Sequence, residues 1–414
     1  MRLKLSFLLI AFLLCYPLPF VHSEERPGNL PKFKIQEIAT DLTVGYAVSI
    51  IDINEDGKPD IVVVDSKRVL WYENPTWKAH IIISGKTKPD NVCLTPLDID
   101  GDGHLDLVLG ADWRPFDTKT GGTLQWLKRG KSLHEEWSIY PICEEPVVHR
   151  VKTAVIDDSG KQAVVLVPLM GRESTKKANW MDGRPVRVLG FHPPSNPMKD
   201  PWKPIVLSEE FHVCHNFIPV ASGTKATSED ILLASYEGVY QLHREGTRWT
   251  AVKKGAGNQD NLGSNRGASE IKQGKFKNGT SFVATIEPWH GNQVVVYPTD
   301  SSGKDKLWRR IVVDDHLRWG HGVWCADLDG DGDDELIIGV RDLPLTTDSF
   351  KEKWGVRVYK ATDQSRTKWS RTIIDQEIAV EDLTAADLNG DGRIDIVAVG
   401  RKTGNARIYW NRGQ

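Results

Sequence analysis

Four acidic segments of the sequence carry oxygen-bearing side chains at a spacing that suits a hard cation. Each follows the pattern D-x-[DN]-x-D-G-x-x-[DE], in which alternate side chains present oxygen atoms and the glycine permits a tight turn. Calcium takes about six to eight oxygen ligands, and the backbone carbonyl of the seventh residue can supply one. We therefore expect Ca²⁺ at up to four sites, formed by Asp52, Asn54, Asp56, Lys58 and Asp60; by Asp98, Asp100, Asp102, His104 and Asp106; by Asp327, Asp329, Asp331, Asp333 and Glu335; and by Asp387, Asn389, Asp391, Arg393 and Asp395.

The spacing of these segments excludes an EF-hand. An EF-hand needs an acidic residue at position twelve and a helix on each side. Position twelve of the first segment is Val63, which lies in an apolar run, and the acid falls at position nine. The segments are therefore predicted to be hairpin loops between strands, where calcium ties the strands together and leaves no open position for chemistry.

Other polar residues are of types that support metal and acid–base chemistry. The chain has 12 histidines, whose imidazoles titrate near neutral pH and commonly bind zinc-like ions. Arginine or lysine follows some of them, as in His149-Arg150 with Lys152 close by. Which of these side chains meet depends on the elements that position them.

Self-similarity along the chain predicts those elements. One unit consists of an apolar strand ending in Asp, an acidic glycine turn, a second apolar strand, a variable loop, a third strand with an aromatic residue, and a Trp that begins a fourth strand. Residues 47–83 show the unit whole. Seven third strands are recognised by Trp71-Tyr72, Trp126, Val188-Leu189, Val239-Tyr240, Val296-Tyr297, Val358-Tyr359 and Ile408-Tyr409.

The fourth strands indicate how the repeat closes. Only six follow a third strand, at Trp77, Trp137, Trp202, Trp249, Trp308 and Trp369, because the seventh unit has no residues left for one. Residues 33–38 resemble these outer strands and precede the first full unit. We therefore predict an all-β, seven-bladed β-propeller over residues 31–414, a single domain in which the N-terminal strand completes the last blade and removes the open sheet edges.

The remaining composition narrows the classes of function. Residues 1–23, with a basic start, an apolar run and Ser23 before the predicted cut, are expected to be a signal peptide, so the protein is predicted to be secreted or periplasmic. No later stretch is apolar enough to cross a bilayer, and the formal charge of −3 gives no indication of nucleic-acid binding. Cys93, Cys143, Cys214 and Cys325 are too few and too scattered for a disulfide framework, and buried thiols are the simpler interpretation.

The propeller fold predicts which polar residues converge. The calcium loops join first and second strands on one face, whereas segments that lead into first strands and loops that follow second strands lie on the opposite face. The segments that lead into first strands carry Asp90-Asn91, His149-Arg150, His212 with His215-Asn216, Arg266, His321 and Glu381-Asp382. The loops that follow second strands carry Asp112-Trp113-Arg114, Trp289-His290 and Arg341. Five histidines are thus expected at one mouth of the central channel, a setting for zinc or a related divalent ion with an anionic or carbonyl substrate.

Two levels of resemblance to known families follow from these motifs. The acidic hairpin loops are similar to the FG-GAP or VCBS repeats of integrin-type propellers. The stretches "HRVK" (149–152), "EPWHGNQVVVY" (287–297) and "WGHGVWCADLDGDGDDELIIGVRD" (319–342) resemble the propeller domain of the aldos-2-ulose dehydratases, also called 1,5-anhydrofructose dehydratases. The 414 residues contain no counterpart of that family's C-terminal cupin-type domain, so the expectation concerns the dehydratase reaction alone.

The second resemblance implies a hydro-lyase that removes water from a keto-sugar, with a histidine as proton acceptor. His149 is the position that matches this histidine, and Arg150 and Lys152 are expected to act beside it. We expect a Zn²⁺-like ion at His215, His290 and His321. The sugar is expected to be bound by Asp90, Trp113, Arg114, Trp289 and Arg341.

Two alternatives remain open at this point. A non-catalytic propeller that binds a glycan or a protein in a calcium-dependent way would explain the acidic loops equally well. A propeller-type polysaccharide lyase, with a Tyr or His base in a long groove, is a third possibility. Elemental analysis separates the first from a metal-dependent enzyme, because calcium alone favours binding and about one zinc-like ion per chain favours catalysis.

Overall fold

The computed structural model describes residues 30–222, 227–299, 307–341 and 354–413. The predicted signal peptide, residues 1–23, lies outside these ranges. Within them, no helix has the length and apolar character that a membrane crossing requires. The only helical element of the described residues is a short 3-10 turn, η1 (Lys176–Ala178).

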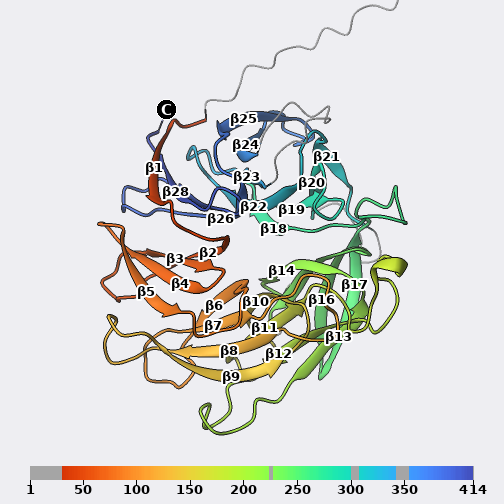
Figure 1. Cartoon of the computed structure of the whole chain (residues 1–414). Coiled ribbons are helices and arrows are strands. Elements are labelled where there is room, and N and C mark those ends of the chain that lie inside the picture. The colour runs from red at the N-terminus through yellow and green to blue at the C-terminus, as the bar shows by residue number, and fades with distance from the viewer. Residues whose placement is uncertain (1–29, 223–226, 300–306, 342–353, 414) are drawn as a thin grey trace, which may run out of the picture.

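The strands form seven four-stranded antiparallel sheets arranged as a ring, which confirms the predicted propeller (Figure 1). Blades one to four comprise β2 (Gly45–Ile51), β3 (Asp60–Asp65), β4 (Arg68–Glu73) and β5 (Lys78–Ser84); β6 (Cys93–Leu97), β7 (Asp106–Ala111), β8 (Thr123–Lys128) and β9 (Ser138–Glu144); β10 (Val148–Val155), β11 (Gln162–Pro168), β12 (Val186–Phe191) and β13 (Ile205–Phe211); and β14 (Cys214–Val220), β15 (Asp230–Ser235), β16 (Gly238–Glu245) and β17 (Arg248–Gly255).

The last three blades repeat this order. They comprise β18 (Ile271–Lys275), β19 (Ser281–Glu287), β20 (Gln293–Pro298) and β21 (Ile311–Asp314); β22 (Gly320–Ala326), β23 (Glu335–Val340), β24 (Gly355–Ala361) and β25 (Trp369–Asp375); and β26 (Val380–Ala386), β27 (Asp395–Gly400) and β28 (Ala406–Asn411) with β1 (Phe33–Ala39). The first strand of every blade lines the centre of the ring (Figure 1).

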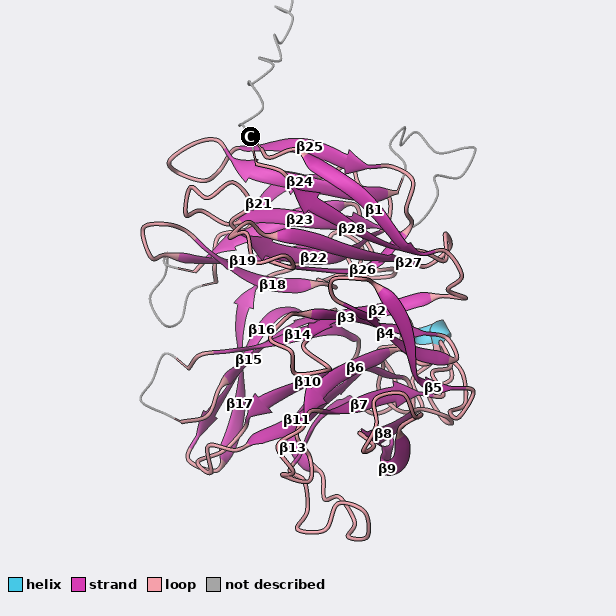
Figure 2. Cartoon of the chain, turned by 90° about the vertical axis from the view of Figure 1, so that its left-hand side faces the viewer, coloured by secondary structure: helices cyan, strands magenta, loops and turns pink. Residues whose placement is uncertain are grey.

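The predicted closing strand is present. β1 pairs with β28 in antiparallel register from Phe33 opposite Asn411 to Ala39 opposite Ala406. The indole of Trp410 donates a hydrogen bond to Gln36 Oε1 over 2.8 Å, which fastens the same pair of strands. Residues from the two ends of the sequence thus share the seventh sheet, as the side view shows (Figure 2).

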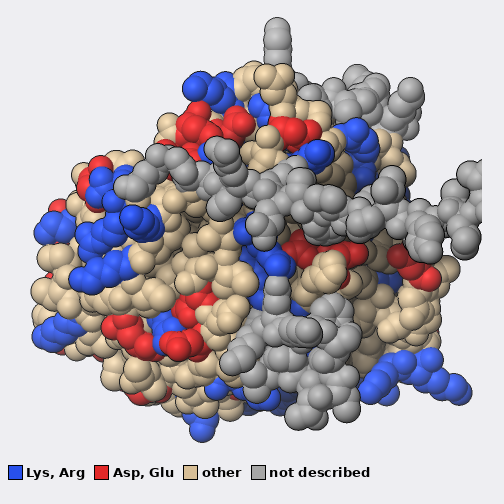
Figure 3. Space-filling model, turned by 90° about the horizontal axis from the view of Figure 1, so that it is seen from above, with Lys and Arg blue, Asp and Glu red and all other residues tan. Residues whose placement is uncertain are grey.

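The core lies between the faces of neighbouring blades. Every residue of the second strands β3, β7, β15, β23 and β27 is buried, which agrees with their continuous apolar runs. The aromatic residues that marked third strands in the sequence, among them Trp71, Trp126 and Tyr409, fill the spaces between the sheets. The surface seen in Figure 3 carries acidic and basic groups side by side, and neither sign forms a continuous field over it.

All four cysteines of the described residues are free thiols. Burial raises the pKa of Cys93 and of Cys143 to about 12. Because the thiolate is the reactive form, these side chains behave as packing residues.

A β-bulge at a constant position distinguishes five of the seven first strands. The pairing register skips one residue between Gly45 and Ala47, and it does so again in β10, β14, β22 and β26. A bulge leaves one residue out of the ladder and re-aims its side chain. The five bulged residues are Tyr46, His149, His215, His321 and Glu381.

Candidate active site

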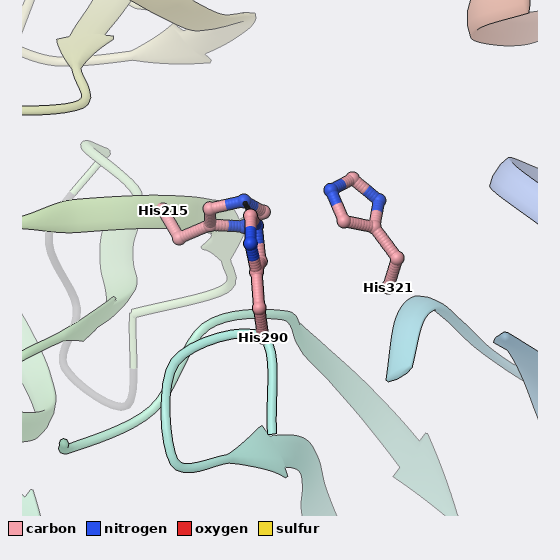
Figure 4. Close-up of side chains that lie close together, drawn as sticks. All are labelled: His215, His290 and His321. Atoms are coloured by element: carbon pink, nitrogen blue, oxygen red, sulfur yellow. Dashed lines mark hydrogen bonds between the residues drawn. The ribbon is translucent and has the colours of Figure 1, made fainter. Parts of the chain in front are cut away.

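Four of the five predicted mouth histidines lie together. The ring of His215 is 4.6 Å from His149, 4.5 Å from His290 and 5.0 Å from His321, measured between ring centroids. Figure 4 shows His215, His290 and His321, which come from three blades, turned toward a common space. Three of the four sit on the bulges described above, whereas His290 follows the second strand of its blade. Bulges in three first strands therefore direct three of these imidazoles into the cluster.

The fifth histidine, His212, lies in the segment before β14 on the same face, but it does not join the cluster. It precedes β14, and its Nδ1 lies 2.9 Å from Glu237 Oε1. Side chains of an extended segment alternate in direction, so the position three residues before His215 faces a different way. His212 therefore serves as a natural reference for the clustered imidazoles.

The carboxylate of Glu270 supports His215. Its Oε1 lies 2.8 Å from His215 Nδ1 and accepts a hydrogen bond from Arg150 Nη2 over 3.3 Å, while Oε2 accepts one from the Asn216 amide. Burial alone would raise the pKa of Glu270, but His215, Arg150 and Asn216 stabilise its charge and lower that pKa to about 2. A carboxylate beside Nδ1 favours the proton there and leaves the lone pair of His215 on Nε2.

His321 is oriented by the backbone of the seventh blade. Its Nδ1 donates a hydrogen bond to the carbonyl oxygen of Glu381, so its lone pair also lies on Nε2. The same Nε2 is 3.9 Å from Glu381 Oε1, and that oxygen accepts a hydrogen bond from Arg401 over 2.7 Å. A neutral imidazole whose ring nitrogen has an unshared lone pair is the form that binds a metal ion.

His290 is the third imidazole of the group that could hold a metal ion. Its Nε2 lies 2.7 Å from His215 Nε2, and its ring stacks on Trp289 with centroids 4.4 Å apart. Two imidazole nitrogens this close must share a proton or a cation. Ligand atoms of a tetrahedral zinc ion stand about 3.4 Å apart at bond lengths of about 2.1 Å, so a small opening of this pair admits the ion.

The residues present therefore fit a zinc-like ion. The nearest nitrogens of His215, His290 and His321 all lie within 4.8 Å of one another. Burial lowers the pKa of each, well below its usual range in the case of His290 and His321. Three neutral imidazoles in a buried pocket match the nitrogen donor set that zinc prefers.

His149 stands at the edge of the cluster with a different partner. Its Nδ1 lies 3.0 Å from Arg150 Nη1, and because guanidinium only donates, Nδ1 is the accepting nitrogen and Nε2 carries the proton. Burial, with Arg150 and His215, holds the pKa of His149 well below its usual range. The imidazole is thus neutral, and its resting tautomer is fixed by Arg150.

Three of the five predicted substrate residues border the imidazole cluster, and the other two do not. Trp113 packs edge-on against His149 at 6.0 Å, Trp289 stacks on His290, and Arg341 approaches Glu381 Oε2 at 3.6 Å, so these three border the cluster. Asp90 lies one step away, accepting a hydrogen bond from Tyr46 over 2.8 Å. The fifth, Arg114, is exposed, and its Nε donates to Asp112 Oδ1 over 2.9 Å.

Backbone strain concentrates on the same face. Of eleven non-glycine residues with positive φ in the described ranges, eight lie in segments that lead into first strands or follow second strands: Asp112, Phe116, Val147, Glu173, Asn179, Trp180, His290 and Trp319. Each such conformation costs about 1–3 kcal/mol and persists mainly at binding and catalytic sites. The strained residues thus gather on the face that carries the imidazole cluster.

Sequence reasoning missed Glu270 and Tyr46, and it placed Glu381 at the channel mouth without giving it a role. Glu270 was overlooked because the fifth blade has a degenerate turn, and Arg266 was placed at the start of a strand that begins at Ile271. Tyr46 and the carboxylate of Glu381 share the bulge position of the three histidines. Aligning the seven first strands on that position would have found both, since it varies only among Tyr, His and Glu where a bulge occurs.

Loss of the Glu270 carboxylate is expected to weaken metal binding. Glu270→Gln should reduce affinity for Zn²⁺ by about 10- to 100-fold, because the carboxylate orients His215 and raises its basicity. Asp382→Asn is the matched control, since Asp382 is a carboxylate of the same channel that has no contact with an imidazole among the described residues. Competition with a chromophoric chelator measures both, and equal affinities would contradict the role of Glu270.

The four acidic loops lie at the opposite ends of the first strands. In three of them the ninth residue ties the loop to its blade: Asp60 accepts hydrogen bonds from the backbone N–H groups of Ile53 over 3.0 Å and Asn74 over 2.8 Å, and Asp106 and Asp395 repeat the arrangement. Carboxylate oxygens of Asp98, Asp100 and Asp106 lie within 4.8 Å of one another, as do those of Asp327, Asp329 and Glu335. These oxygen-rich loops fit a hard cation.

A lysine enters two of the loops from the third strand. Lys128 Nζ bonds to Asp100, and Lys360 Nζ bonds to Asp329 and, over 2.7 Å, to Asp331. The strand registers place Glu73 and Trp410 at the equivalent position of the other two blades. Those two blades have Asn54 and Asn389 at the third loop position in place of an aspartate. A loop with Asp at this position thus has a lysine beside it that balances the extra negative charge, and a loop with neutral Asn has none.

Comparison with known proteins finds two family matches and one curated relative. Residues 121–300 match the family described as "Aldos-2-ulose dehydratase, beta-propeller domain", and residues 52–109 match the FG-GAP-like repeat. The aldos-2-ulose dehydratase of Phanerodontia chrysosporium is 27% identical over 296 residues, which cover 67% of this chain and 32% of that protein. The chain therefore spans about a third of the length of this relative.

Solved structures support the fold alone. Two crystal structures of BBS1N in complex with ARL6DN, one soaked with mercury and one with lead, have TM-scores of 0.52 and 0.51. Each is 12% identical and covers 93% of this chain and 98% of that chain. This chain is a seven-bladed β-propeller with an FG-GAP-like repeat, and it resembles the propeller domain of aldos-2-ulose dehydratase.

Proposed function

We propose that this chain is an exported sugar dehydratase that eliminates water from a keto-sugar of the 1,5-anhydrofructose or aldos-2-ulose type. The observation that carries the proposal is the buried cluster of four neutral imidazoles on the strained face of the propeller. The similarity to the propeller domain of aldos-2-ulose dehydratase supports the same class of reaction. Export rests on residues 1–23, and N-terminal sequencing of the secreted chain, expected to begin after Ser23, tests it.

Metal binding belongs to the proposal. His215, His290 and His321 would hold a zinc-like divalent ion, which, when bound, supplies a positive charge that polarises the sugar carbonyl. Arg341 lies close enough to add a second positive charge on that side, because its guanidinium approaches Glu381 beside His321. The side chains of Trp113 and Trp289 offer apolar surfaces against which the sugar ring is oriented.

Proton transfer is assigned to His149. Elimination breaks the C–H bond next to the carbonyl and the C–O bond of the neighbouring hydroxyl, and a carbon–carbon double bond forms. His149 accepts the carbon-bound proton and passes it to the departing hydroxyl, so that one water leaves. To accept at Nδ1, the imidazole must lose its contact with Arg150, whose other amino group already donates to Glu270.

The decisive experiment follows the product. Chain loaded with Zn²⁺ and incubated with 1,5-anhydrofructose is expected to produce the ultraviolet band of an enone, while chain stripped of the ion is expected to be inactive. Elemental analysis of the purified chain runs in parallel. About one zinc-like ion per chain with a band supports the enzyme, whereas calcium alone and no band would favour a propeller that only binds a glycan or a protein.

Calcium at the acidic loops is the structural part of the proposal, and the Lys–Asp pairs give it a sharp test. Lys128→Met removes a positive charge next to the second loop and is expected to raise its calcium affinity about tenfold or more. Adding Asp100→Asn, which copies the loops with Asn54 and Asn389, is expected to return the affinity to its original value. Isothermal titration measures this cycle, and an unchanged affinity in Lys128→Met would show that the lysine does not act on the loop cation.

A further inference from the structure

A polar cavity lies directly beneath the imidazole cluster, in the centre of the ring. It has a volume of about 420 Å³ and is lined by first-strand residues of several blades. Its charged and amide-bearing walls are formed by Arg150, Lys152, Asn216, Glu270, Lys272 and Asp382. Three of these side chains are basic and two are acidic, so the cavity holds an excess of positive charge.

The two carboxylates are already occupied. Glu270 is engaged by Arg150, Asn216 and His215. Asp382 accepts backbone hydrogen bonds from Val48 and Leu383, each over 3.0 Å. Neither carboxylate makes a hydrogen bond or an ion pair within 4.0 Å with Lys152 or Lys272 among the described residues.

The ammonium groups of Lys152 and Lys272 face aromatic rings. Lys272 Nζ lies 3.4 Å from the ring centroid of Trp324, and Lys152 Nζ lies 5.9 Å from that of Phe217. Among the described residues, neither ammonium has a carboxylate oxygen within 4.0 Å or a hydrogen-bond acceptor. Both side chains are half-buried, and cation–π contact compensates only part of the hydration that each ammonium group has lost.

We propose that this cavity binds one small monovalent anion, such as a halide, between Lys152 and Lys272. Asp382 and Glu270 act on the two lysines only from a distance, without a hydrogen bond or an ion pair within 4.0 Å, so the anion supplies the direct partner. The cavity volume accommodates it together with several water molecules. Burial, together with the neighbouring positive charge of Lys152, lowers the pKa of Lys272 to about 7, although Asp382 and Glu270 act to raise it. The site lies below the proposed sugar site and requires no sugar chemistry.

Bromide is the probe that tests this site. Crystals of the full chain grown with bromide at pH 6, where Lys272 is protonated, are expected to show one anomalous peak between the two lysines. The melting temperature is also expected to be higher in a bromide salt than in the salt of an anion too large to enter the cavity. Lys272→Met is expected to abolish the peak and to weaken bromide binding at least tenfold.

Two further variants keep the test decisive. Lys253→Met removes a lysine that also faces an aromatic ring, Tyr240 at 5.8 Å, but lies on an outer strand, and it is expected to leave bromide binding unchanged. Lys272→Arg keeps the charge and is expected to keep the peak if Lys272→Met fails to fold. Wild-type crystals without anomalous density in the cavity, or density that survives Lys272→Met, would overturn the proposal.

Discussion

His149→Ala is expected to lower kcat for the enone-forming reaction by about two to four orders of magnitude, the usual effect of removing a residue that transfers a proton in the transition state. The low pKa of His149 gives the expectation a pH signature. A histidine whose pKa lies below its usual range stays neutral until the solution is more acidic than that range, so the acid limb of the kcat profile should fall below pH 6.5. Stopped-flow absorbance across pH 4–8 measures both.

A second variant separates two roles for this side chain. His149→Gln keeps a donor near the position of Nε2 but cannot accept a proton at neutral pH. If His149 transfers protons, His149→Gln should be as impaired as His149→Ala. If it only donates a hydrogen bond from the tautomer that Arg150 fixes, His149→Gln should retain most of the activity, and the assignment to proton transfer would be wrong.

His321→Ala is expected to reduce Zn²⁺ affinity by more than about 100-fold, because it removes a ligand rather than a group that supports one. The imidazole of His321 is oriented by a hydrogen bond from its Nδ1 to the backbone carbonyl of Glu381. Replacing His321 by alanine removes this imidazole and leaves one side of the proposed ion without a ligand. Direct metal analysis after dialysis gives the stoichiometry, and the d–d spectrum of the Co²⁺-loaded chain reports the change in ligand set.

His212→Ala is the control for this experiment. His212 is three residues from His215 in the sequence and pairs with Glu237 outside the cluster. Its variant should bind metal as the wild type does. Equal loss in both variants would indicate general destabilisation, and full retention of metal by His321→Ala would remove His321 from the proposed ligand set.

The architecture could be predicted from the sequence because the strands of each blade follow one another along the chain in the same order. The third-strand aromatics and fourth-strand tryptophans have direct packing roles, so their spacing survives even where a turn degenerates. The closing strand followed from a missing element, since seven third strands and six trailing fourth strands leave one edge to be covered by residues 33–39.

The site was less readable because it depends on irregularities within the strands. A one-residue bulge decides whether a side chain points to the mouth or to a neighbouring blade, and nothing in the composition around His212 and His215 separates them. The Glu270 partner of His215 comes from another blade, and the contact depends on the angle between sheets. The lysines that enter the acidic loops were missed for the same reason, as Lys128 and Asp100 are distant in sequence.

The pairing of β1 with β28 has a consequence for biosynthesis. The first strand to leave the ribosome remains without its partner, its backbone groups hydrogen-bonded only to water, until the last strand arrives more than 360 residues later. An unpaired strand of this kind can associate with other chains. A bulky tag fused close to Phe33 would therefore be expected to interfere with closure of the ring.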